Sequence, residues 1–215
     1  MRNHAWVGYA RSHYAFALTI GLLVLTVCNI AFGSQALELP FQYGNPAAGI
    51  PMRRELPIAF AALAAGSLHS KMTQFEFTAT RVLRQYETQH LLAVFVTTTL
   101  LVGGTELAIE GVGKAIVLTR ALWIWLGLAL LSGRLFGRLL SWILPVATIF
   151  PLTYLGQDEL GRDRWWEWTS QPASSAACWS ITVAVTVTGL AAFYLTPWHW
   201  HSLRVRRSHA SSTRR

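Results

Sequence analysis

The chain has 215 residues and a formal net charge of +8, and 53% of its residues are hydrophobic while only 13% are charged. Soluble domains carry about 25% charged residues, so this composition excludes an ordinary water-soluble globular domain. Two cysteines are too few for a disulfide framework or a four-cysteine metal site, and the basic residues are spread between apolar runs rather than clustered as nucleic-acid binding requires.

Apolar runs separated by charged residues predict an all-α, polytopic membrane protein with six transmembrane helices. A helix crosses roughly 30 Å of hydrocarbon with about 20 mostly apolar residues, because it satisfies its own backbone hydrogen bonds there. The predicted spans are 14–33, 55–69, 90–105, 115–132, 139–156 and 176–197. They form one transmembrane domain over residues 1–202, which a basic cytoplasmic tail follows at 203–215; its composition predicts disorder.

The length and composition of the first, second and fifth predicted spans decide how each is interpreted. The first has an apolar core longer than the roughly 7–15 residues of a signal peptide, so we interpret it as a membrane-spanning helix. The second is short and rich in alanine, and Arg54 and Glu55 would have to reach back to the interface at its start. Pro145 and Pro151 in the fifth predict a kink or a break in that helix.

Two polar stretches between the spans carry aromatic residues. In residues 70–89, apolar side chains such as Phe75 and Leu83 alternate with charged ones, which predicts an amphipathic helix at the membrane interface between the second and third spans. Residues 157–175 contain a cluster of three tryptophans, and indole rings favour the headgroup region. We therefore expect this second stretch to lie at the outer membrane surface.

The distribution of charge predicts the orientation in the plasma membrane. With six spans and a cytoplasmic N-terminus, the cytoplasmic segments hold twelve basic and two acidic residues, and the outer segments hold six basic and eight acidic residues. Cytoplasmic loops of membrane proteins are enriched in Lys and Arg. The sequence thus predicts that both termini are cytoplasmic.

Four charged residues near the end of the third span and the start of the fourth form a candidate site. Glu106 and Glu110 are one helical turn apart, and Lys114 and Arg120 could act as their partners. Acidic residues at membrane depth often line a substrate path or a proton relay. The alternative, which we consider the stronger, is a structural ion pair at the outer surface.

Histidine and cysteine patterns give no metal prediction. His69 and His90 lie near the cytoplasmic ends of adjacent spans, where interfacial anchoring is a better interpretation than haem ligation. The same interpretation applies to the His-x-His at 199–201. Cys28 and Cys178 both fall toward the outer half, so a disulfide between them stays open. No hydrolase, metalloprotease or phosphate-binding motif is present, so we predict no catalytic activity and no cofactor.

The layout resembles the permease subunits of ABC-2-type exporters. The matching pieces are LHSKMTQFEFTATR at 68–81, between the second and third spans, and DRWWEW at 163–168, before the last span. The phrases LHS at 68–70 and GRLLSWILP at 137–145 are also similar to those of small actinobacterial membrane proteins. The resemblance implies a permease without catalysis of its own that forms a homodimer or heterodimer. It would export a hydrophobic or amphipathic substrate together with a separate ATP-binding subunit. In that family the first piece forms a coupling helix and the second forms short re-entrant helices.

A coupling helix needs apolar side chains that seat in a groove of the ATPase and charges that fix its orientation. The residues expected to make this contact are Phe75, Glu76, Phe77, Arg81, Leu83 and Arg84. The alternative is that the segment only rests on the anionic inner leaflet. Two other functions also stay open: a non-catalytic membrane scaffold or accessory subunit, and an integral membrane enzyme that handles lipids or quinones.

Overall fold

The computed structural model describes residues 15–38, 49–68, 81–158 and 162–195 and is almost entirely helical. The elements in chain order are α2 (Ala15–Phe32), β1 (Ala36–Glu38), β2 (Gly49–Pro51), α3 (Met52–Gly66), α5 (Arg81–Ile109), α6 (Val112–Leu135), η1 (Arg138–Leu140), α7 (Ile143–Ala147), α8 (Ile149–Leu155) and α9 (Ala176–Leu195). The two strands form one small antiparallel sheet, in which Leu37 pairs with Ile50. The all-α prediction is thus confirmed for the helical bundle, to which this strand pair is added.

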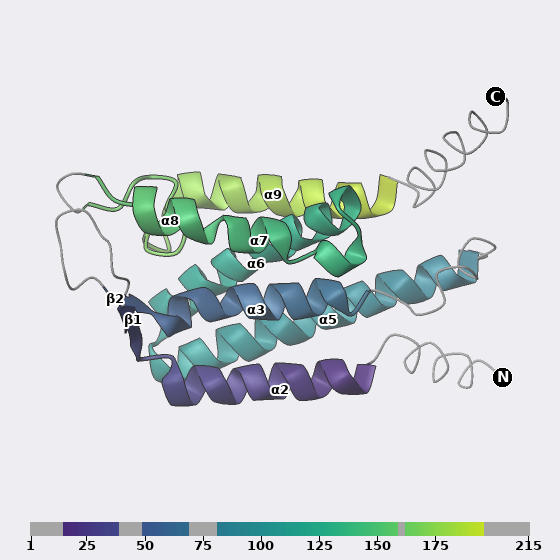
Figure 1. Cartoon of the computed structure of the whole chain (residues 1–215), viewed down its shortest axis with the longest axis horizontal. Helices are drawn as coiled ribbons and strands as arrows, with labels where there is room; N and C mark the ends of the chain where they lie inside the picture. The colour runs from purple at the N-terminus through teal and green to yellow at the C-terminus, as the bar shows by residue number, and fades with distance from the viewer. Residues whose placement is uncertain (1–14, 39–48, 69–80, 159–161, 196–215) are drawn as a thin grey trace, which may run out of the picture.

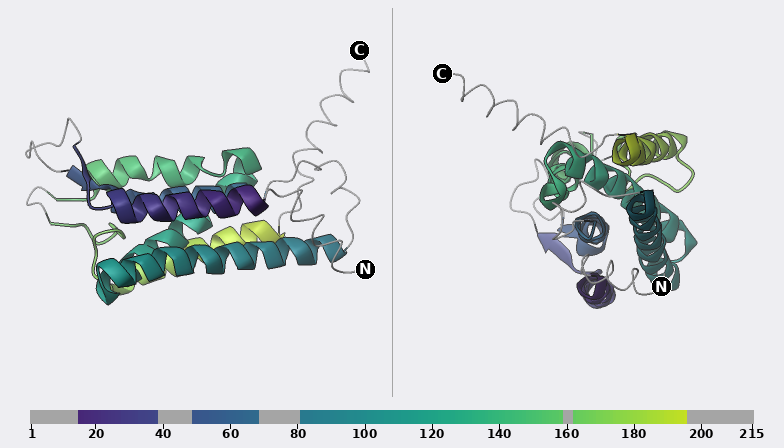
Figure 2. Two further views of the ribbon diagram at one scale, coloured as in Figure 1. Left: turned by 90° about the horizontal axis from the view of Figure 1, so that it is seen from below. Right: turned by 90° about the vertical axis from the view of Figure 1, so that its right-hand side faces the viewer.

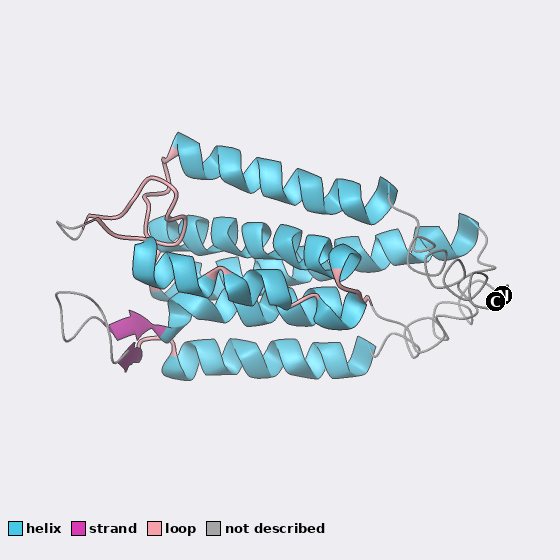
Figure 3. Cartoon of the chain, turned by 45° about the horizontal axis from the view of Figure 1, so that its top comes forward, coloured by secondary structure: helices cyan, strands magenta, loops and turns pink. Residues whose placement is uncertain are grey.

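The helices run back and forth along one axis of the molecule (Figure 1). At one end lie the strand pair, the turn between α5 and α6, and the segment 162–175 that leads into α9 (Figure 3). We call this the hairpin end. The last residues of α3, α6 and α9 and the first residues of α2 and α5 lie at the other end, which we call the opposite end. Successive long helices therefore alternate in direction.

Helix α6 is the centre of the bundle. It packs against α9, α3, α5, α7 and η1, and its residues Ala121, Leu122 and Trp125 are completely buried. Helices α2 and α9 lie on opposite edges, as the end-on view shows (Figure 2). Since only α6 is buried on most of its surface, it organises the packing of the other helices.

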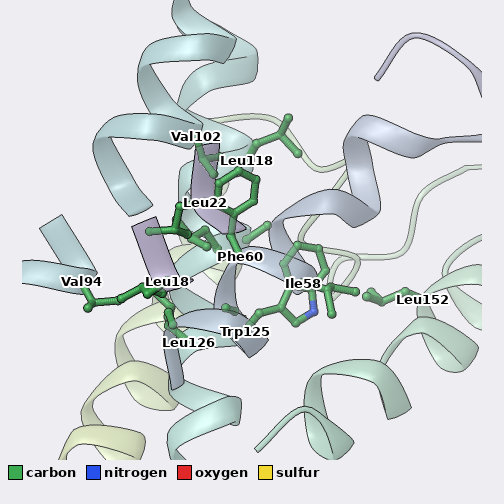
Figure 4. Close-up of a cluster of buried hydrophobic side chains, with 14 residues drawn as sticks. Leu18, Leu22, Ile58, Phe60, Val94, Val102, Leu118, Trp125, Leu126 and Leu152 are labelled. Carbon is green, nitrogen blue, oxygen red and sulfur yellow. The ribbon is translucent and has the colours of Figure 1, made fainter. Parts of the chain in front are cut away.

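The core in the middle of the bundle is apolar and combines side chains from five helices. Phe60 of α3 and Trp125 of α6 are buried beside leucines of α2 and α6, and Leu152 of α8 closes one side (Figure 4). The indole of Trp125 donates a hydrogen bond of 3.0 Å to the Thr148 hydroxyl, which satisfies its N–H in this apolar setting. Close packing of this kind makes each core side chain sensitive to changes in volume.

Two glycines let α6 and α9 approach closely. A Cβ atom added to Gly127 would lie 2.7 Å from the Val185 carbonyl oxygen, and one added to Gly189 would collide with the Gly127 backbone. Small residues at a helix crossing allow backbone contact, which is the main source of packing between membrane helices. This crossing therefore has no room for a side chain on either helix.

Three of the described helices are long and apolar enough to cross a membrane: Gln85–Ile109, Val112–Leu135 and Ala176–Leu195. Two further apolar helical stretches, Phe16–Phe32 and Ile143–Leu155, are shorter. Many large apolar side chains on the outer helices are exposed, as lipid contact requires. These features indicate an integral membrane protein.

The third predicted span is part of a longer helix. Helix α5 begins at Arg81, so residues 81–89 of the predicted interfacial helix continue directly into the predicted span 90–105. Residues 70–80 of that prediction lie outside the described residues. The predicted break in the fifth span is confirmed: Pro151 cannot donate a hydrogen bond back to Ala147, and the chain divides there into α7 and α8.

The other predicted spans agree with helices of the structure, with shifted ends. The first and last match α2 and α9, and the fourth matches α6, which extends by three residues at each end of 115–132. The second begins three residues before the predicted position 55, since α3 starts at Met52 directly after β2. The predicted tail at 203–215 lies outside the described residues.

Candidate functional site

Charged side chains are buried at the hairpin end, where α2, α3, α5 and the segment 162–175 meet. We call this group the buried polar cluster, and its members are Asn29, Arg53, Arg54, Glu55, Glu106, Glu110 and Glu167. Ionised groups lose much hydration free energy on burial, so they persist only with close partners. The geometry of the cluster shows which partners these are.

Arg53 of α3 contacts two carboxylates near the end of α5: Glu106 lies in the helix, and Glu110 follows directly after its last residue, Ile109. Its Nη1 donates to Glu110 Oε1, and its Nε lies 3.7 Å from Glu106 Oε1. The amide of Asn29 in α2 donates a hydrogen bond of 2.8 Å to Glu106 Oε1. Glu106 is fully buried, whereas 42% of the Glu110 side chain is exposed. This half of the cluster thus links α2, α3 and α5 through one buried carboxylate.

Arg54 forms the other half of the cluster with the segment before α9. Its Nη2 donates to Glu167 Oε1, and its Nε lies 4.0 Å from Glu55 Oε1. Glu167 is fully buried and also accepts hydrogen bonds from the Thr169 hydroxyl and the Ser170 backbone N–H. The neighbouring arginines Arg53 and Arg54 therefore point to different carboxylates and tie different parts of the chain to α3.

The strand pair fixes the position of the two arginines. The Met52 N–H donates to the Gln35 carbonyl at 2.9 Å, and the Arg53 N–H donates to the Gly33 carbonyl at 3.1 Å. These bonds hold the first turn of α3 against the end of α2. A Cβ on Gly33 would lie 2.7 Å from Arg53 Nε and would meet the Asn29 carbonyl oxygen as well, so only glycine fits there.

Arg120 is fully buried but does not belong to the cluster. Its guanidinium donates hydrogen bonds of 2.8–3.0 Å to three backbone carbonyls, those of Trp168, Gln171 and Pro172. The predicted pairing of Arg120 with Glu106 or Glu110 is therefore wrong. The physical reason is that the segment 162–175 folds back over α6 and supplies acceptors that need no negative charge.

A pocket of about 480 Å³ opens beside the cluster. Its charged lining consists of Arg53, Arg54, Lys114, Glu106, Glu110 and Asp163, and its other walls come from Gly33, Ser34, Leu118, Thr169 and Ser170. Glu106 Oε2 is buried and has no hydrogen-bond partner, although Glu106 Oε1 accepts one from Asn29 and lies 3.7 Å from Arg53 Nε. A buried carboxylate oxygen without a donor is energetically unfavourable, so this atom is the best candidate for contact with a ligand.

Comparison with known proteins gives no relative. The chain matches no family model, no curated protein and no solved structure.

The predicted site residues separate into two groups in the structure. Glu106, Glu110 and Lys114 line the same pocket, whereas Arg120 lies apart. Of the predicted coupling residues, Arg81, Leu83 and Arg84 lie in the first turn of α5 at the opposite end. Phe75, Glu76 and Phe77 lie outside the described residues.

Five residues of the cluster were missed as site residues at the sequence level: Asn29, Arg53, Arg54, Glu55 and Glu167. The signal that could have found three of them is the run Arg53-Arg54-Glu55 directly before an apolar stretch. We expected these charges to extend outward to the interface, but they turn inward because α5 and the segment 162–175 offer carboxylates there. Asn29 lies within an apolar run, where a lone amide is a useful indicator of a polar contact.

The histidine and cysteine hypotheses have limited support in the part of the chain that the structure describes. His90 is buried, and its Nε2 lies 3.1 Å from the Ser67 hydroxyl. His69, His199 and His201 lie outside the described residues. Cys28 and Cys178 are both free thiols, so the disulfide between them is not formed. No group of three potential metal ligands occurs among the described residues.

Proposed function

We propose that this protein is a six-pass membrane permease subunit whose pocket at the hairpin end receives the solute. The observation that carries the proposal is the burial of Arg53, Glu106 and Glu167 at one end of an otherwise apolar bundle. Ionisable groups at membrane depth are rare, face the interior of a bundle and commonly line the paths of substrates or ions. A purely structural protein of this size could fill the same volume with apolar side chains.

The arrangement of the helices supports six passes. Helices α2, α3, α5, α6, the α7–α8 pair and α9 alternate in direction between the two ends (Figure 1). Helix α3 is only 15 residues long and would extend for about 22 Å, but its charged first turn can lie at the membrane interface. In this topology the hairpin end faces outward and both termini are cytoplasmic, in agreement with the charge distribution.

An ATP-binding partner is the second part of the proposal. Leu68 and Arg81, which flank residues 69–80, both lie at the opposite end, so a coupling segment between them would be on the cytoplasmic side. A partner ATPase would bind this interfacial segment, and two permease subunits would enclose the path as a dimer. The resemblance to ABC-2-type permeases supports this partner, and the pocket supports transport.

Co-purification tests the proposal. The tagged full-length protein is isolated from native membranes in mild detergent, and we expect an ATP-hydrolysing subunit to accompany it. The double charge reversal Glu76→Lys and Arg81→Glu should release that subunit, while Arg162→Glu should retain it, because the side chain of Arg162 is 73% exposed and belongs to the segment 162–175 at the hairpin end. Isolation without an ATPase, or retention after the double reversal, contradicts the proposal.

A further inference from the structure

We propose that the pocket binds a small zwitterion that carries a primary ammonium group and a phosphate. This inference rests on the proposed function and names the class of its ligand. The pocket is lined by three basic and three acidic side chains, so its formal charge is balanced. A balanced lining with both signs is complementary to a ligand with both signs, and it gives little attraction to a simple anion or cation.

Glu106 is the expected contact of the ammonium group. Its Oε1 is occupied by Asn29 and Arg53, but its buried Oε2 has no donor within hydrogen-bond distance. A primary ammonium has three N–H donors and can supply the missing bond at low steric cost. A quaternary ammonium has none, so the site should discriminate between the two.

Lys114, in the first turn of α6, is the expected contact of the phosphate. Its side chain lines the pocket, is exposed and has no ion-pair partner among the residues that the structure describes. A lysine ammonium is a point charge that commonly binds phosphate oxygens. Glu106 and Lys114 lie on either side of the short turn between α5 and α6, so one small ligand can contact both.

The ligand can be a free solute or the headgroup of a lipid. A volume of about 480 Å³ is within the range of small-molecule sites and exceeds the needs of a single ion. The shared chemistry is the phosphoethanolamine group, either in solution or attached to acyl chains. The choice of bilayer in the experiment distinguishes these two sources.

Calorimetry on the full-length protein in phosphatidylcholine nanodiscs tests the inference. We expect O-phosphoethanolamine to bind at least about tenfold more tightly than phosphocholine, ethanolamine or inorganic phosphate, because only this probe satisfies both ends of the pocket. Nanodiscs made with phosphatidylethanolamine should weaken the apparent binding of the probe if the lipid headgroup is the natural ligand. An unchanged affinity in those nanodiscs assigns the site to a free solute. Equal binding of phosphocholine, or no binding of O-phosphoethanolamine, overturns the inference.

Two variants complete the test. Glu106→Gln keeps an acceptor for Asn29 but removes the charge, and Lys114→Met removes an exposed cation without disturbing the core; each should weaken probe binding about tenfold or more. Arg162→Gln is the matched control, since it removes an exposed cation at the hairpin end outside the pocket. Unchanged binding in both pocket variants overturns the inference. Isolation of the unsubstituted protein without an ATPase would overturn the proposed function instead, and would leave the calorimetric result as it is.

Discussion

The hairpin end and the middle of the bundle use the same helices for different purposes. In the middle, α3 and α6 contact each other through Phe60, Leu122 and Trp125, which are fully buried and almost free of polar atoms. At the hairpin end, α3 contributes Arg53 and Arg54, which are paired with carboxylates from other parts of the chain. The comparison indicates that the apolar middle provides stability, whereas the polar end fixes the relative positions of helices around a pocket.

The largest effect is expected where a buried charge loses its partner. Arg53→Gln leaves Glu106 without its cation and should destabilise the protein by about 3–5 kcal/mol. Thermal unfolding in detergent micelles, followed by circular dichroism, measures this change. The additional substitution Glu106→Gln should recover part of the loss, because the uncompensated charge disappears.

The control for this prediction is an exposed ion pair at the same end. The pair between Arg162 and Asp158 has one partner that is 73% exposed, so Arg162→Gln should change stability by about 0.5 kcal/mol or less. If the Arg53 and Arg162 variants unfold at the same temperature, the buried pair of Arg53 and Glu106 contributes no more to stability than an exposed ion pair.

An intermediate effect is expected at Arg120, which holds the segment 162–175 onto α6. Arg120→Gln removes charge-assisted hydrogen bonds to three carbonyls and should destabilise that segment by about 2–3 kcal/mol. Cys178 reports the change, because it is fully buried and its Sγ lies 3.5 Å from the Trp165 carbonyl oxygen.

Thiol labelling measures the release of this segment. In a Cys28→Ser background, Arg120→Gln should make Cys178 react about 30- to 150-fold faster with a small maleimide, because a destabilisation of about 2–3 kcal/mol raises the open population of the segment by that factor. The parent protein should react slowly. Equal labelling rates would mean that Arg120 does not hold the segment closed.

A smaller effect is expected in the apolar middle at the crossing of α6 and α9. Gly189→Ala places a methyl group against the Gly127 backbone and should destabilise the bundle by about 1–3 kcal/mol. Gly104→Ala is the matched control, since a Cβ there meets no atom within 4 Å and should be neutral or slightly stabilising. Similar unfolding temperatures for the two variants would contradict the close approach of the helices.

The helices made of long apolar runs were predicted well from the sequence, whereas the polar start of α5 was not. Long apolar runs define α2, α6 and α9 to within a few residues, because the signal is local and extends over 18 or more positions. The start of α5 was missed because residues 81–89 are polar, and a helix that projects beyond an apolar run has the same composition as an interfacial one.

The site was less predictable than the fold. Glu106 and Glu110 were identified because they are one turn apart in sequence, but their partner Arg53 is more than fifty residues away and only packing brings it close. The partners of Arg120 were missed for a different reason, since backbone carbonyls leave no signal in a sequence. Local patterns thus indicated which residues are unusual but could not assign their contacts.

Cysteine labelling from one side of the membrane tests the central claim most directly. In a background with both Cys28→Ser and Cys178→Ser, single cysteines are placed at Ser34 and Arg162 at the hairpin end and at Gln85 and Phe136 toward the opposite end, all exposed positions. A membrane-impermeant maleimide added to intact cells should label the first two sites, and should reach the last two only after permeabilisation. Labelling of Gln85 or Phe136 in intact cells, or different sidedness of Ser34 and Arg162, would contradict the six-pass topology and the outward-facing pocket.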